Sequence, residues 1–129
     1  MDKKPSEYIT EFLKFVADAK MQHRICGEEV NNQDKLTQDY LHKLELGELK
    51  RDERSKVATK LAINRQDRRY YKDRVEEFEP IVKFFEDPVN KKVLDKMTQV
   101  LGETRRWESY HKERTYKPRV LKEKKDEQH

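Results

Sequence analysis

The sequence has few of the residues that interrupt helices or cross-link small domains. Its 129 residues include three Gly, four Pro and one Cys. The single Cys26 can form no internal disulfide and cannot alone hold a structural metal, which fits a reducing compartment. No apolar run approaches the ~18 residues of a membrane-spanning helix, and the N-terminal sequence MDKK is not followed by a secretory apolar core. We therefore expect a cytoplasmic protein with no membrane partner.

Charge is what the sequence has in abundance. Charged residues make up 43% of the chain and hydrophobic residues 33%, against about 25% and about 45–50% in typical soluble domains. This composition is typical of long helices and coiled coils and argues against a sheet. The length predicts one small domain. We therefore predict an all-α fold, with a single helical domain over residues 1–116 and a basic flexible tail over residues 117–129.

The first predicted helix covers residues 6–46. Ser6 is a candidate cap, Gly27 a candidate bend, and Gly47 stands where a C-terminal cap is needed. One seam follows alternating steps of three and four residues through Ile9, Phe12, Val16, Ala19, His23, Cys26, Val30, Gln33, Thr37, Tyr40 and Leu44. This heptad spacing predicts a rod roughly 60 Å long, so part of the helix must protrude or pair.

A second seam predicts a second long helix over residues 52–79. It runs through Val57, Leu61, Asn64, Arg68, Tyr71, Val75, Phe78 and Val82, and Pro80 is expected to end the helix or to begin a short new one. Antiparallel pairing about a turn near Leu49 would place Gln33 near Asn64. Together with Thr37 and Arg68, these two residues form a polar stretch of the seam. Either they hydrogen-bond one another and fix the register, or the stretch is open to water or a ligand.

A third predicted helix covers residues 88–113. Asp87 is predicted to cap this helix, and Pro88 is predicted to be its first residue. Its apolar face comprises Val89, Val93, Met97, Val100 and Trp107, and it is widened by Leu94 and Leu101. We expect this face to pack against residues 8–16 and 75–85, so that a long antiparallel helical hairpin with a coiled-coil-like arm stands on a three-helix base.

Positive charge is concentrated in two segments. Residues 50–74 contain ten basic and four acidic residues, and residues 112–129 contain seven and four, whereas acidic residues predominate in the rest of the chain. Such patches favour phosphates, acidic protein surfaces or anionic membranes. The candidate anion- or partner-binding residues are Arg65, Arg68, Arg69, Tyr70 and Lys72 in the first segment and Arg106, Tyr110, Arg114, Tyr116 and Arg119 near the second.

Both groups of candidates have a structural alternative. Arg65, Arg69 and Lys72 lie on one outward helix stripe that could follow a row of phosphates, or they could belong to a solvated face paired with nearby carboxylates. Near the tail, aromatic and arginine side chains are typical of binding hot spots, although cations at a helix C-terminus also complement its dipole. Trp107 is expected to be a core anchor.

The sequence contains no recognisable catalytic motif. There is no Gly-rich phosphate loop and no Ser or Cys in a nucleophile context, so we expect a non-enzymatic protein without a cofactor. His23 and Cys26 share a helix face at metal-ligand spacing, but two ligands are too few and no second pair is present. We therefore expect no metal site.

The segment EPIVKFFEDPVNKKVLDKMTQVLGETRRWESYHKERTYKPR resembles the C-terminal part of small uncharacterised helical proteins encoded by phages and prophages of Gram-positive bacteria. The resemblance implies a genomic context and no active site. With the segregated charge, it leads to the hypothesis of a phage accessory or inhibitor protein. Such a protein would act in the host cytoplasm by binding a host protein or nucleoprotein complex, with defence systems among the candidates. The alternatives are direct nucleic-acid binding and a homo-oligomer that sequesters a phosphorylated nucleotide signal.

Overall fold

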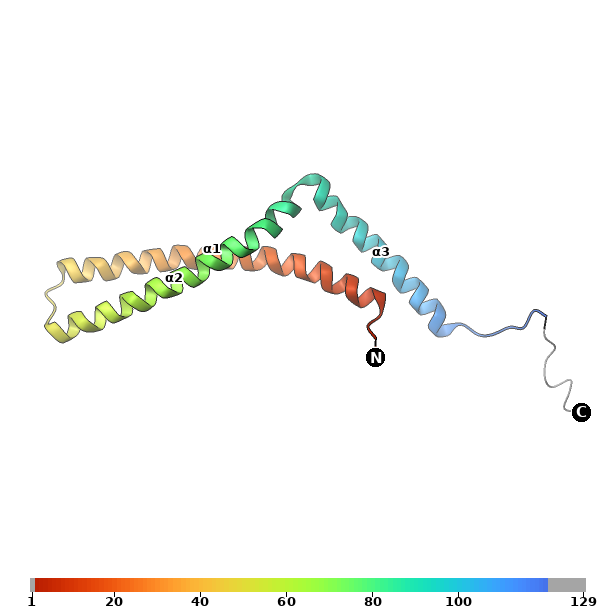
Figure 1. Cartoon of the computed structure of the whole chain (residues 1–129), viewed down its shortest axis with the longest axis horizontal. Coiled ribbons are helices and arrows are strands. Elements are labelled where there is room, and N and C mark those ends of the chain that lie inside the picture. Colours follow the sequence, from red (N-terminus) through yellow and green to blue (C-terminus); the bar gives the residue numbers. More distant parts are fainter. Residues whose placement is uncertain (1, 121–129) are drawn as a thin grey trace, which may run out of the picture.

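The chain folds into three long helices joined by short connections. The computed structural model describes residues 2–120, which form α1 (Pro5–Leu46), α2 (Arg51–Glu86) and α3 (Pro88–Glu113), with no strand in that part of the chain. Helices α1 and α2 run antiparallel over most of their length, and α3 turns back from the end of α2 toward the start of α1 (Figure 1). The predicted all-α hairpin with a third helix is confirmed. Of the predicted tail, residues 121–129 lie outside the described residues.

Helix α1 begins and ends close to its predicted bounds, but its N-cap differs from the prediction. Lys4 occupies the cap position with extended backbone, and Pro5 opens the first turn. Ser6 is therefore inside the helix, and the prediction that it caps α1 is wrong. At the other end the Gly47 N–H donates to the Lys43 carbonyl at 3.0 Å. The candidate bend at Gly27 does not interrupt the helix.

Helix α2 does not end before Pro80, contrary to the prediction. It continues to Glu86 with Pro80 inside it. The proline costs one backbone hydrogen bond, but the turns that follow it bury Val82 and Phe85, and Phe85 meets Phe12 of α1 edge-on at 6.2 Å. Burying two large apolar side chains contributes about 1.5–3 kcal/mol each, which offsets a penalty of about 3 kcal/mol. Packing therefore holds the helix together beyond the proline.

The core is a narrow seam along the hairpin. Its buried apolar residues are Val16, Ala19, Cys26, Val57, Val82, Phe85 and Leu101. Most of them come from α1 and α2, and Leu101 is the one buried residue of α3. All three helices pack together only at one end of the molecule, which we call the base. Beyond it, the arm consists of α1 and α2 alone (Figure 1). No helix within residues 2–120 has the length and apolarity that crossing a membrane requires.

Helix α3 begins as predicted, but only the Leu101 edge of its predicted apolar face reaches the core. The Asp87 carboxylate caps it by accepting a hydrogen bond from the Val89 N–H at 2.9 Å. Leu101 points inward, whereas Val89 and Trp107 are 72% and 63% exposed. The prediction that Trp107 anchors the core is therefore wrong.

The rotation of α3 follows from a hydrogen-bonded contact with α1. The Glu108 carboxylate accepts the Ser6 hydroxyl at 2.6 Å and the Ser6 backbone N–H at 3.0 Å. Glu108 lies seven residues after Leu101, so both residues face α1 together. The residue next to each of them, Val100 or Trp107, is then turned by about 100° away from the core.

Candidate anion-binding surface

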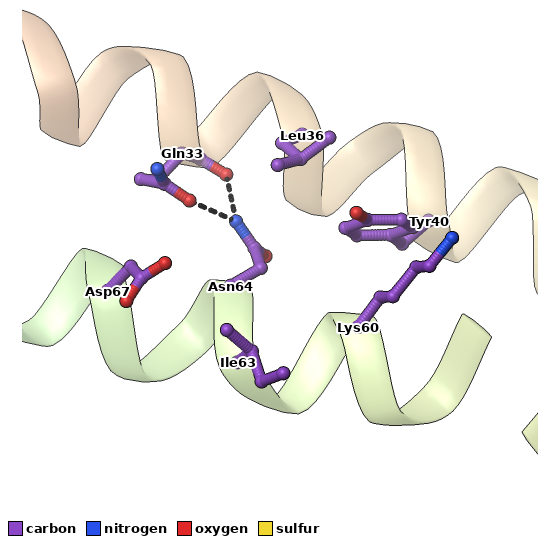
Figure 2. Close-up of a pocket in the computed structure, with 7 residues that line it drawn as sticks. All are labelled: Gln33, Leu36, Tyr40, Lys60, Ile63, Asn64 and Asp67. Carbon is purple, nitrogen blue, oxygen red and sulfur yellow. Dashed lines mark hydrogen bonds between the residues drawn. The ribbon is translucent and has the colours of Figure 1, made fainter. Parts of the chain in front are cut away.

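A polar layer crosses the hairpin at the height of Asn64. The Asn64 amide nitrogen donates to the carbonyl and to the side-chain oxygen of Gln33 at 3.0 and 2.7 Å, and its amide oxygen accepts the Thr37 hydroxyl at 2.6 Å (Figure 2 shows the two bonds to Gln33). Asn64 is 2% exposed, and among the described residues no buried side-chain nitrogen or oxygen lacks a partner. Gln33 and Asn64 lie together as predicted. The layer is satisfied internally, which supports its role in fixing register.

Arg68 belongs to the edge of this layer rather than to its centre. It was predicted to share the polar stretch with Asn64, but its guanidinium Nε instead donates to the Asp34 carboxylate across the hairpin. The Arg68 side chain is mostly buried, while that of Asp34 is half exposed. Because the Arg68 guanidinium pairs with Asp34 and is mostly buried, it is poorly placed to bind an outside partner.

The other three candidate cations of α2 form what we call the basic ridge: Arg65, Arg69 and Lys72. At 100° per residue the three positions fall within a sector of about 60°, and they extend over about 10 Å of helix. Arg65 and Arg69 are exposed and Lys72 is half-buried. Among residues 2–120, no carboxylate lies within ion-pair distance of any of the three; the nearby Arg74 pairs with Glu77. The alternative of a face neutralised by its own carboxylates is therefore not what the structure contains.

Tyr70 is separated from the basic ridge. Its ring packs edge-on against Tyr71 at 5.3 Å and is largely exposed. At 100° per residue it lies about 100° from Arg69, 140° from Arg65 and 160° from Lys72, toward the other flank of α2. Tyr70 and the basic ridge therefore cannot contact one flat ligand together.

A shallow groove opens on that other flank of the arm. Figure 2 shows Lys60 extending beside the Tyr40 ring, with Leu36 and Ile63 facing each other across the two helices. The groove is lined by Gln33, Leu36, Tyr40, Lys60, Ile63, Asn64 and Asp67. Leu36 and Ile63 were not candidates from the sequence, because neither lies on the heptad seam. Their apolar character at positions flanking the seam is the signal that could have identified them.

The candidates near the tail lie at the far end of α3. Arg106 and Tyr110 are exposed on the helix, and Trp107 meets Tyr110 edge-on at 5.9 Å. Arg114, Tyr116 and Arg119 follow the end of α3 and are exposed. The basic ridge lies midway along α2, so the structure does not bring the two groups of candidates together (Figure 1).

Two carboxylates of the base, Glu79 and Glu108, have lowered pKa values. The hydrogen bond from His23, together with its charge, lowers the pKa of Glu79, and Lys83 adds to the effect. The hydrogen bonds from the Ser6 hydroxyl and backbone N–H lower the pKa of Glu108. In the described part of the chain, no group of three or more His, Cys, Asp or Glu is placed to hold a metal ion. His23 faces Glu79, while Cys26 is buried in the seam.

Comparison of the chain with protein-family models, with curated proteins and with solved structures finds no match. Its function is therefore inferred from its own surfaces.

Proposed function

We propose that the protein is a non-enzymatic binding protein whose basic ridge docks on an anionic surface of a partner protein or nucleoprotein complex. In the phage context that the sequence resemblance implies, the partner would belong to the host and the protein would inhibit or redirect it. The observation that carries the proposal is the row of three cations on α2 with no carboxylate partner among the described residues.

The form of the arm supports this role. An exposed pair of helices holds the ridge at fixed spacing, so little backbone entropy is lost on binding. Guanidinium groups offer several donors to carboxylates or phosphates, and a cationic surface accelerates encounter with an anionic one. Arg68 and Asp34 stiffen the hairpin beside the ridge. The ridge therefore presents charge on a preorganised support.

The test is affinity capture from cells that contain the partner, with and without nuclease treatment. The triple variant Arg65→Glu, Arg69→Glu, Lys72→Glu should lose the captured partner while far-UV circular dichroism stays unchanged, because none of the three side chains is buried. A second triple variant, Lys14→Glu, Lys35→Glu, Lys92→Glu, makes the same change in net charge at exposed positions elsewhere.

The outcomes separate the alternatives. Loss of the partner in the ridge variant alone supports the proposal. Equal loss in both triple variants would show that net charge, and not the ridge, attracts the partner. Recovery of nucleic acid alone, abolished by nuclease and falling steeply with salt, would replace a protein partner by direct nucleic-acid binding.

A further inference from the structure

Helix α3 carries an apolar stripe that no other part of the described chain covers. The stripe, which we call the α3 stripe, consists of Val89, Val93, Val100 and Trp107, whose side chains are 72, 40, 42 and 63% exposed. The last three are seven residues apart, so they occupy equivalent heptad positions. Together the four expose on the order of 400 Å² of mostly apolar surface, as much as the largest patch of a typical monomer.

Heptad spacing on an exposed face is the pattern of a helix that packs against another helix. Helix α3 already uses its neighbouring face, with Leu101 and Glu108, to contact α1. The α3 stripe is one position away on each turn and therefore remains available for a second contact. Glu103, Arg106, Trp107 and Tyr110 also line a shallow depression on this outer face, large enough to receive an apolar side chain.

Charges beside the stripe identify the occupant. Lys96 and Glu103 are both exposed, and at 100° per residue both lie on the same edge of the stripe, on either side of Val100. In an antiparallel pair of α3 helices centred near Val100, Lys96 of each copy faces Glu103 of the other. Val93 then faces Trp107 of the other copy. In a parallel pair the two copies of this edge would lie on opposite sides of the contact, so Lys96 and Glu103 would not pair across it.

We propose that two copies of this chain associate through the α3 stripe, α3 against α3 in antiparallel orientation, about a two-fold axis near Val100. The contact is self-complementary, as a two-fold interface requires. The pairing is independent of the basic ridge, which lies on α2.

The experiment measures the mass of the full chain by sedimentation over a concentration series. Because Trp107 is the only tryptophan, its fluorescence reports the same event: emission should shift to the blue as the dimer forms. Val100→Glu sets two like charges at the axis and should weaken the dimer at least tenfold. Ser109→Glu, exposed on the opposite face of the same helix, makes the same change in charge and should leave the dimer unchanged.

Exchanged charges test the orientation. Lys96→Glu and Glu103→Lys should each weaken association, and the double variant should restore it, because the pair across the axis is re-formed with its signs reversed. A wild-type chain that is monomeric throughout the series, or a dimer that Val100→Glu leaves intact, would overturn the proposal. A double variant weaker than both single variants would overturn the antiparallel pairing. Unchanged helix content in the variants excludes misfolding as the cause.

Discussion

Replacing Asn64 is the most direct test of how the hairpin is held in register. Asn64→Ala removes three hydrogen bonds: those to the carbonyl and the side-chain oxygen of Gln33, and the one from the Thr37 hydroxyl. The Thr37 hydroxyl can then donate to the Gln33 carbonyl, 2.9 Å away, and the Gln33 side chain is exposed enough to turn to water. Three lost hydrogen bonds at about 1 kcal/mol each, partly offset by these new partners, and a small cavity give an expected destabilisation of about 2–3 kcal/mol.

A second substitution separates polarity from volume. Asn64→Leu fills the cavity with an apolar side chain at a heptad position, so we expect it to stay within about 1 kcal/mol of the wild type. It should nevertheless lower the protection of arm amides from hydrogen exchange, because a leucine tolerates slipped registers that the amide does not. Gln66→Ala, on the exposed side of α2, is the control and should change little.

The measurement is urea unfolding followed by far-UV circular dichroism, with hydrogen exchange on the same variants. An Asn64→Ala variant within about 0.5 kcal/mol of the wild type would refute the reasoning, because the layer would then contribute nothing to the hairpin. Equal losses in Asn64→Ala and Asn64→Leu would show that the lost hydrogen bonds, and not the cavity, determine the cost, because leucine restores the volume but not the bonds.

Three further results are expected. Gly47→Ala should destabilise the turn by about 1 kcal/mol or more in thermal unfolding, since an added Cβ would lie 2.5 Å from the Lys43 carbonyl oxygen, and a wild-type melting temperature would contradict this. Asp87→Ala should cost about 1 kcal/mol by removing the α3 cap, whereas Asp87→Asn should cost less. Glu108 has a lowered pKa, so its contribution is complete above the pKa of the unfolded chain and is lost as the pH falls through the lower folded value. Acid should therefore loosen α3 from Ser6, and Glu108→Gln should flatten that part of the pH profile of stability.

The number, order and approximate bounds of the helices follow from heptad spacing, Pro88 and Gly47, because these signals are local. The end of α2 was mispredicted because Pro80 is a local signal, whereas the burial of Phe85 against Phe12 depends on a distant segment. The proximity of Gln33 and Asn64 was predictable, since antiparallel pairing follows once the turn is located.

The orientation of α3 could not be read from the sequence. Two apolar series lie one residue apart, one through Leu94 and Leu101 and the other through Val93 and Val100. Periodicity alone does not tell which series faces inward. The hydrogen bonds between Ser6 and Glu108, 102 positions apart, select the first series. The same kind of distant contact explains Arg68: the seam position was correct, but Asp34 was not foreseen as its partner.

The position of the Ser6–Glu108 contact has a mechanical consequence for the whole molecule. Helix α3 is joined covalently to α2 at Asp87 and is fastened to α1 at its other end, so the three helices close a triangle. This closed arrangement resists shear better than two paired helices alone, because α2 cannot slide along α1 without pulling Glu108 of α3 away from Ser6. The base is thereby braced against shear, so the arm that carries the basic ridge keeps its direction relative to the base.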